Sequence, residues 1–236
     1  MLLVLFVAKP LVIAHRGASV EKPENTLAAF HRALALKADG IELDVHLTRD
    51  GVPVAFHDAH LSRLTGVRGR ITAKSWPELK GLRVLGTEPI PRLVDVLRLT
   101  GGRALVQIEL KAGLPVAPVI RAIKAARAME WVIFASFAPG LLREARRLAP
   151  GVPRMLICMG RQTPGSLVRR LAAIGASGLS VDHRAVRDST WVRYFHLRGY
   201  TVWCWTVNDA GRARQLVGWG IDALLGDNPV LLKRAV

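Results

Sequence analysis

Apolar runs of strand length alternate with helix-like periodicity along almost the whole chain, and this alternation restricts the possible folds more than any other feature. Eight runs have the length and composition of buried strands: 11–14, 40–47, 104–110, 132–137, 154–158, 178–181, 201–207 and 223–225. Helix-like segments lie between them, at 26–36, 93–99, 115–128, 139–148, 165–174, 189–197 and 210–217, with a last turn after Asn228. Eight strand–helix units in 236 residues predict an α/β protein, a (β/α)8 TIM barrel.

A doubly wound open sheet is the alternative fold. Such sheets usually have fewer strands, and no Gly-rich dinucleotide-binding loop follows the first strand here. No linker divides the chain, so residues 1–236 are expected to form one domain. Residues 61–91 have weak periodicity and many Gly and Pro residues. We interpret them as an insertion after the second strand that caps the barrel mouth, where active sites of this fold lie.

Composition limits the possible partners. The net charge of +16 favours anionic ligands, but no nucleic-acid-binding motif accompanies it, so no nucleic-acid partner is expected. The apolar run 2–8 is too short to cross a membrane and lacks the flanks of a signal peptide. We interpret it as an extra strand or a plug, with no stable membrane insertion and a cytoplasmic location. Cys158 and Cys204 lie in apolar runs and are expected to be buried free thiols.

Acidic side chains follow two of the predicted strands at a spacing that brings them together. Glu42 and Asp44 are two residues apart, so they project to the same side of the second strand. Glu109 and Lys111 have the same relation on the third barrel strand. Three carboxylates at one mouth repel one another unless a cation lies among them, and oxygen ligands suit Mg²⁺ or Ca²⁺. The alternative is that Glu42 or Glu109 forms an ion pair with Arg16 or Lys111 without a metal.

Two histidines lie at the ends of extended segments, beside acidic and basic residues. His15 ends the first strand, and His57 follows the run 54–56. Such a pair can supply a general acid and a general base near neutral pH. Arg16 and Lys111 add positive charge that can hold a phosphate. These residues together predict phosphoryl transfer without a covalent protein intermediate.

Other residues have smaller expected roles. Asn25 is expected to cap the first helix, and Asp58 to point away from His57 and serve a structural role. Trp205 is either a core residue or an apolar wall for the substrate, and Ser136 with Phe137 is a candidate to line the pocket.

Several short motifs together resemble the glycerophosphodiester phosphodiesterase family. They are His15-Arg16-Gly17, Pro23-Glu24-Asn25-Thr26, Ile41-Glu42-Leu43-Asp44-Val45, Thr48-Arg49-Asp50-Gly51, His57-Asp58, Ile108-Glu109-Leu110-Lys111, Ser136-Phe137, Trp205-Thr206-Val207-Asn208 and Asn228-Pro229. Each motif alone is weak, but their order and spacing are specific, and they cover nearly the whole chain. Two departures stand out: Gly226-Asp227 replaces the Thr-Asp common in the family, and the insertion is short.

The resemblance implies a (β/α)8 barrel and a site built from the residues above. Glu42, Asp44 and Glu109 would bind a divalent cation, Mg²⁺ or Ca²⁺. His15 and His57 would be the catalytic acid–base pair. Arg16 and Lys111, with Trp205, would bind the substrate.

The resemblance also implies the reaction. A small glycerophosphodiester, such as glycerophosphocholine or glycerophosphoethanolamine, would give glycerol 3-phosphate and an alcohol. The glycerol hydroxyl next to the ester would attack phosphorus, and water would open the resulting cyclic phosphate. Two alternatives stay open: hydrolysis of lysophospholipids by lysophospholipase D-type chemistry, and a non-catalytic barrel that binds a phosphate ligand.

Overall fold

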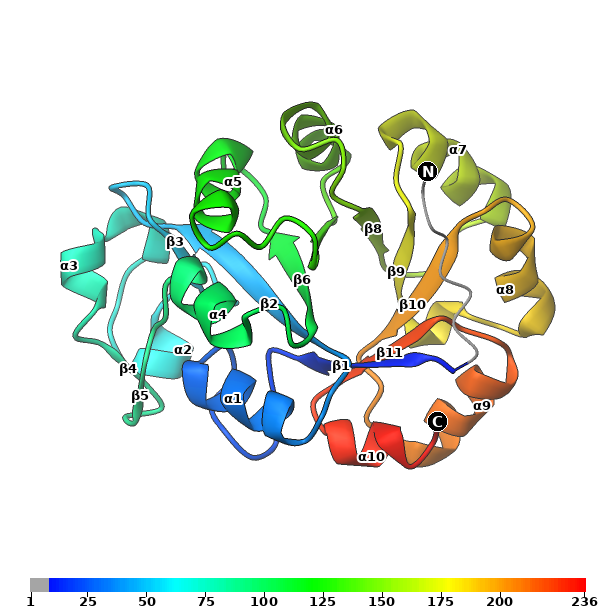
Figure 1. Ribbon diagram of the computed structural model, residues 1–236, viewed down its shortest axis with the longest axis horizontal. Helices are drawn as coiled ribbons and strands as arrows, with labels where there is room; N and C mark the ends of the chain where they lie inside the picture. Colours follow the sequence, from blue (N-terminus) through cyan, green and yellow to red (C-terminus); the bar gives the residue numbers. More distant parts are fainter. Residues whose placement is uncertain (1–8) are drawn as a thin grey trace.

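Eight parallel strands close into a ring in the computed structural model, which describes residues 9–236 (Figure 1). The strands are β1 (Leu11–His15), β2 (Gly40–Leu47), β6 (Leu105–Leu110), β7 (Val132–Ser136), β8 (Arg154–Cys158), β9 (Gly178–Asp182), β10 (Thr201–Trp205) and β11 (Ala223–Gly226). Strand β1 pairs with both β2 and β11, which closes the barrel and rules out the open sheet. The predicted TIM barrel is confirmed. The expected extra strand or plug at 2–8 lies outside the described residues.

Helices surround the ring; most connect successive barrel strands, and the last one follows β11 (Figure 1). They are α1 (Leu27–Ala35), α4 (Leu93–Thr100), α5 (Val116–Ala125), α6 (Pro139–Leu148), α7 (Pro164–Ile174), α8 (Ser189–His196), α9 (Ala210–Gly218) and α10 (Pro229–Lys233). The expected cap at Asn25 is wrong, because the Thr26 hydroxyl accepts the hydrogen bond from the backbone N–H of Ala29. Asn25 instead has a φ of 56° and is buried. That conformation releases its side chain from the helix end for a contact described below.

Strand alternation divides the apolar residues between two cores. One core lies between the strands and the surrounding helices and contains residues such as Phe30, Phe134 and Phe195. The other fills the barrel interior with Ile13, Ile133, Ala135, Met155, Ile157, Trp203, Ala223 and Leu225. Successive side chains of a strand point to opposite faces. The inward-facing residues nearer the carboxyl end of each strand, beyond this interior core, therefore place their side chains in the barrel mouth.

Residues 61–91 form a small layer of their own beside the barrel. The layer contains α2 (Ser62–Thr65), a 3-10 turn at Ile71–Ala73, α3 (Trp76–Leu79), β4 (Arg83–Val84) and β5 (Glu88–Pro89). Its apolar side chains, including Leu61, Ile71 and Leu79, pack with Val54 and Phe56. Val54 belongs to β3 (Pro53–Ala55), which pairs antiparallel with β2. In Figure 1 the layer lies at one side of the ring, next to β3.

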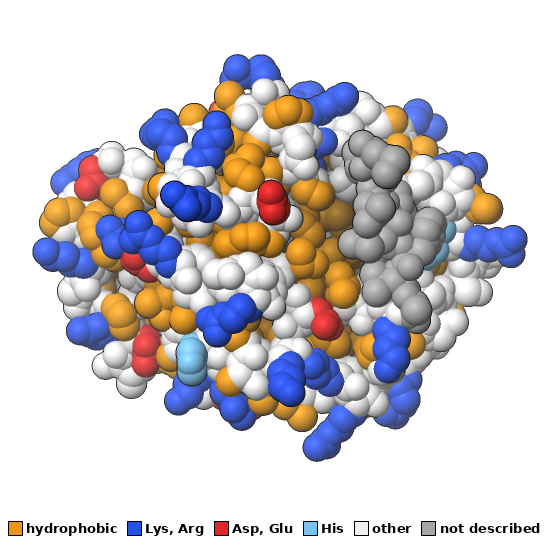
Figure 2. All heavy atoms as spheres, in the orientation of Figure 1, with side chains coloured by type: hydrophobic (Ala, Val, Ile, Leu, Met, Phe, Trp, Pro, Cys, Tyr) orange, Lys and Arg blue, Asp and Glu red, His pale blue; other side chains and the backbone are white. Residues whose placement is uncertain are grey.

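The structure locates the surface charges on one face and both thiols. On the face shown in Figure 2, Lys and Arg side chains are scattered around the periphery and do not form one stripe. Cys158 and Cys204 are buried and free, as predicted. Burial raises the pKa of the Cys158 thiol to about 11, so it stays protonated at neutral pH. Among residues 9–236, no helix is both long and apolar enough to span a bilayer.

The closeness of β9 and β10 predicts a sharp response to one added methyl group. In Gly178→Ala the new Cβ would lie 2.3 Å from the carbonyl oxygen of Thr201 on the neighbouring strand. Such overpacking is expected to lower the free energy of unfolding by about 1–3 kcal/mol. Gly218→Ala, at a helical position with no atom within 4 Å of the new Cβ, is the matched control and should be neutral or slightly stabilising. Urea denaturation of both variants measures the difference, and equal stabilities would contradict the packing argument.

Candidate active site

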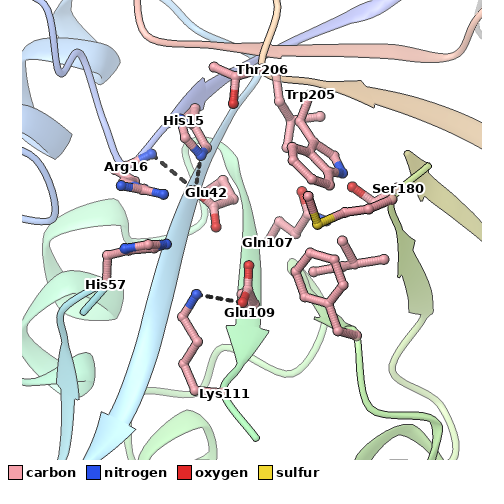
Figure 3. Close-up of a pocket in the computed structure, with 14 residues that line it drawn as sticks. His15, Arg16, Glu42, His57, Gln107, Glu109, Lys111, Ser180, Trp205 and Thr206 are labelled. Carbon is pink, nitrogen blue, oxygen red and sulfur yellow. Dashed lines mark hydrogen bonds and ion pairs between the residues drawn. The ribbon is translucent and has the colours of Figure 1, made fainter. Parts of the chain in front are cut away.

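A cavity of about 310 Å³ opens at the carboxyl ends of the strands (Figure 3). Its lining comes from strands and loops all around the ring: His15, Arg16, Glu42, His57, Gln107, Glu109, Lys111, Phe137, Ile157, Met159, Ser180, Trp205, Thr206 and Leu225. Of the residues predicted to be catalytic, substrate-binding or metal-binding, all line this cavity except Asp44, which is buried and in contact with Lys111. The barrel therefore brings together side chains that are up to 210 positions apart in the sequence, between His15 and Leu225.

Three carboxylates meet at the edge of this cavity. Asp44 and Glu109 are direct neighbours in the register of β2 and β6. Glu42, Asp44 and Glu109 each offer one oxygen, and these oxygens lie within 4.8 Å of one another. Burial and the nearby Asp44 charge raise the pKa of Glu42 to about 7. Burial and Asp44 also raise the pKa of Glu109. Ionising all three carboxyl groups at once is therefore unfavourable.

Two cationic side chains offset part of this repulsion. Lys111 Nζ lies 2.6 Å from Asp44 Oδ1 and 2.5 Å from Glu109 Oε1. Arg16 Nε lies 3.2 Å from Asp44 Oδ2, and the Arg16 backbone N–H donates to Glu42. Burial alone would raise the pKa of Asp44, but Lys111 and Arg16 outweigh it and lower that pKa. Of the ion pairs expected without a metal, the one between Glu109 and Lys111 forms, whereas Glu42 meets only the backbone N–H of Arg16. Both cations also pair with Asp44, which was not expected.

His15 is held by Asp227, for which the sequence pattern predicted no role. Its Nδ1 lies 2.7 Å from Asp227 Oδ1, just after β11. A carboxylate only accepts hydrogen bonds, so Nδ1 carries the proton and Nε2 is left for the cavity. Nε2 lies 4.0 Å from Glu42 Oε2. Burial lowers the pKa of His15, but the Asp227 hydrogen bond and the Glu42 charge outweigh burial, so the pKa is raised overall.

His57 has an equivalent partner. Its Nδ1 lies 2.7 Å from Asp58 Oδ1, so the expectation that Asp58 points away from His57 is wrong. The short run 54–56 ends in a loop, where the strict alternation of a strand no longer applies. Hydrogen bonds from Arg63 are the main reason that the pKa of Asp58 falls to about 2. Asp58 is therefore ionised at neutral pH and orients the His57 ring.

Arg63 joins two loops of the mouth. Its Nε donates to Asp58 Oδ2 at 2.6 Å, and its Nη2 donates to Glu24 Oε1 at 2.8 Å. Glu24 also accepts from Arg16 Nη1 at 2.9 Å. Through these contacts the layer 61–91 is linked to both Arg16 and His57. Sequence reasoning did not identify Arg63 or the contacts of Glu24, because no local spacing relates these positions.

Asn25 makes two hydrogen bonds to Asp44. Asn25 Nδ2 donates to Asp44 Oδ2 at 2.8 Å, and Asn25 Oδ1 accepts from the Asp44 backbone N–H. The Asn25 side chain therefore fixes the position of Asp44 from the loop before α1.

The opposite wall of the cavity is apolar. The rings of Phe137 and Trp205 meet edge to face with centroids 5.9 Å apart. Trp205 thus forms part of a wall as well as packing against the interior core. Ser136 does not line the cavity, because its hydroxyl donates to the backbone carbonyl of Leu110. Gln107, which had no predicted role, lies between the two walls (Figure 3).

Comparison with known proteins identifies the family. The model of the glycerophosphoryl diester phosphodiesterase family matches residues 15–231. The chain belongs to this family. It is 34% identical to a glycerophosphodiester phosphodiesterase of Caldanaerobacter subterraneus subsp. tengcongensis, over 95% of this chain and 96% of that protein.

Solved structures of the family agree in fold. An Oleispira antarctica phosphodiesterase in complex with the product sn-glycerol-3-phosphate superposes with a TM-score of 0.88 and 32% identity, covering 96% of each chain. A Thermotoga maritima glycerophosphodiester phosphodiesterase superposes with a TM-score of 0.83 and 27% identity, covering 98% of this chain and all of that one, 100%. With these relatives, the chain is a phosphodiesterase of the glycerophosphodiester class, and the predicted family and enzyme class are confirmed.

The acidic cluster is compatible with a divalent cation. The donors of Glu42, Asp44 and Glu109 are all oxygens, they converge within 4.8 Å, and their mutual repulsion would be relieved by a cation. Burial, together with the charge of Asp44, raises the pKa of Glu42 to about 7, and a cation among the three carboxylates would counter that rise.

The balance of charge in the cluster can be tested by removing one cation. Lys111→Met leaves Asp44 and Glu109 without their shared ammonium group, so in the presence of a chelator the free energy of unfolding should fall on the order of 3 kcal/mol. Saturating Mg²⁺ or Ca²⁺ should restore part of this loss. Urea denaturation measures both effects, with Lys124→Met, which removes an exposed ammonium group on α5, as the control. Unchanged stability of Lys111→Met in chelator would show that the ion pairs are not needed.

Proposed function

We propose that the cavity hydrolyses small glycerophosphodiesters, such as glycerophosphocholine and glycerophosphoethanolamine, to sn-glycerol 3-phosphate and the free alcohol. The observation that carries this proposal is the pair His15 and His57 on one cavity with the carboxylate cluster, Arg16 and Lys111. An oriented acid–base pair and fixed cations are what an anionic diester requires. The complex of the Oleispira antarctica enzyme with sn-glycerol-3-phosphate supports the same product.

The proposed chemistry uses both histidines through Nε2. Because Asp227 and Asp58 engage the Nδ1 atoms, each ring is oriented with Nε2 available to the substrate. One ring takes the proton of the glycerol hydroxyl next to the ester as its oxygen bonds to phosphorus. The other gives a proton to the alcohol oxygen as its bond to phosphorus breaks. Water then opens the cyclic phosphate with the two roles exchanged. An internal nucleophile has a high effective concentration, so the chain needs no nucleophile of its own.

The remaining residues of the site have binding roles in this proposal. Arg16 and Lys111 hold the phosphodiester oxygens, and Trp205 packs against the carbon skeleton of the substrate. Glu42, Asp44 and Glu109 would hold Mg²⁺ or Ca²⁺, which would offset phosphate charge and lower the pKa of the attacking hydroxyl. A cytoplasmic location stays a prediction that rests on the free thiols.

Removal of the cation or of either histidine tests the proposal directly. EDTA should abolish hydrolysis of glycerophosphocholine, and added Mg²⁺ or Ca²⁺ should restore it. His15→Ala and His57→Ala should each lower kcat by about 10²–10⁴-fold, the usual contribution of a general acid or base. His31→Ala, an exposed position on α1, is the matched control. Release of free choline measures the rate, and full activity in either cavity variant would remove that histidine from the mechanism.

We also propose that the layer 61–91 supports the mouth through Arg63. No residue of this layer lines the cavity, so its contribution to the site passes through Asp58 and Glu24. That the layer caps the mouth stays a prediction.

Arg63→Met should lower kcat by about 10- to 100-fold, because small displacements of catalytic groups have effects of this size. Arg63→Lys should retain part of the activity, since one ammonium group can reach only one of the two carboxylates well. Arg68→Met, at an exposed position of the same layer, is the control. Steady-state kinetics measures kcat, and thermal unfolding shows whether each variant is still folded, so a positioning effect can be told from a loss of fold. An unchanged kcat in a folded Arg63→Met protein would refute the proposed support.

A further inference from the structure

Gln107 is a buried polar residue on the inner face of β6. Only 2% of it is exposed, and its carboxamide oxygen has no hydrogen-bond partner among the described residues. Its neighbour on β7 is Ile133, and Leu105, two residues earlier, packs against the apolar interior core. An unpaired buried amide oxygen is unfavourable, because it has lost its hydrogen bonds to water, and an apolar side chain of the same size would avoid that cost. The amide is therefore best explained by a partner from outside the chain.

Neighbouring groups indicate the chemistry of that partner. Ser180 is 1% exposed and lines the same cavity, and the buried indole Nε1 of Trp205 also has no hydrogen-bond partner among the described residues. An amide and a hydroxyl both donate and accept, and the indole donates. None of the three groups is charged. Such a set matches a neutral hydroxyl and is a poor match for a phosphate or an ammonium group, which the cations and carboxylates nearby would bind.

The position of Gln107 indicates which part of the substrate it meets. Gln107 is two residues before Glu109 on the same strand, so its side chain lies about 6.6 Å deeper in the barrel. A phosphate held by Arg16 and Lys111 would thus have one substituent directed inward, towards Gln107. On the outer side, Phe137 and Met159 line the cavity and are 42% and 56% exposed. The variable alcohol can leave on that side, which directs the glycerol half inward.

We propose that Gln107, with Ser180 and the Trp205 indole N–H, forms a subsite for the free terminal hydroxyl of the glycerol half. This inference rests on the proposed function and names the substrate class of that site. A lysophospholipid has a fatty acyl chain on that hydroxyl, so it cannot make the contact, and the chain would meet a floor in which Gln107 and Ser180 are only 2% and 1% exposed. The subsite therefore favours glycerophosphodiesters over lysophospholipids.

The test compares two substrates that differ in one hydroxyl. One is glycerophosphocholine, and the other is its analogue with hydrogen in place of the terminal hydroxyl, which keeps the hydroxyl next to the ester. Wild-type kcat/KM should be about tenfold or more lower for the analogue, because the lost hydroxyl leaves buried groups unpaired. In Gln107→Met the two substrates should differ by less than about threefold, since the contact is gone for both. Ile133→Leu, a repacked interior neighbour, should keep the wild-type ratio.

Each outcome decides for or against the subsite. Equal kcat/KM values in the wild type, or an unchanged ratio in Gln107→Met, would overturn it. If circular dichroism shows that Gln107→Met is unfolded, Ser180→Ala takes its place, and its ratio should also fall. If the wild type with Mg²⁺ or Ca²⁺ hydrolyses neither substrate, the proposed function fails. The subsite is then tested separately by measuring ligand binding with calorimetry. sn-Glycerol 3-phosphate should bind about tenfold more tightly than its analogue without the terminal hydroxyl, whereas equal affinities would exclude the subsite.

Discussion

Repulsion among Glu42, Asp44 and Glu109 is the constraint on which the rest of the site depends. The register of β2 and β6 places Asp44 directly beside Glu109, and the same alternation places Glu42 one step deeper. Three buried carboxylates cannot all be ionised at low energy without positive charge nearby. Lys111 lies between two of them, and Arg16 approaches from β1. The cations proposed to bind the phosphate are thus the same ones that pair with the carboxylates, so in this proposal substrate binding would redistribute these ion pairs.

The orientation of the two histidines shows how distant parts of the chain complete one site. His15 lies at the start of the chain, and its partner Asp227 follows the last barrel strand, 212 positions away. The pairing of β1 with β11 brings them together, so closure of the barrel is itself a condition for a correctly oriented His15. His57 depends instead on Asp58 and on Arg63 from the side layer. One histidine is therefore fixed by the barrel and the other by the layer 61–91.

Much of this arrangement could be predicted, because it follows from short-range periodicity. The strands were identifiable as apolar runs, and their ends as titratable residues, so the barrel and the set of residues at its mouth followed. Asp227, Arg63 and the contact of Asn25 with Asp44 were not identifiable in this way. Each depends on which side chains face one another across elements, and that is decided by register and by the left-handed backbone at Asn25. Asp58 was misplaced because the alternation of a strand was extended into a loop.

The contrast between the two walls of the cavity gives a reason for the polar groups at its floor. Ile157 and Trp205 of the apolar wall stabilise the barrel by burial, in the same way as the interior core beneath them. An apolar residue in place of Gln107 would make the folded chain more stable, since it would bury no unpaired amide. Natural sequences keep such unfavourable groups chiefly where function requires them. The same reasoning applies to the carboxylate cluster, which apolar residues of similar volume could replace with a gain in stability. Both features are unfavourable in the folded chain alone, and both would become favourable if the proposed cation and the proposed glycerophosphodiester supplied the missing partners.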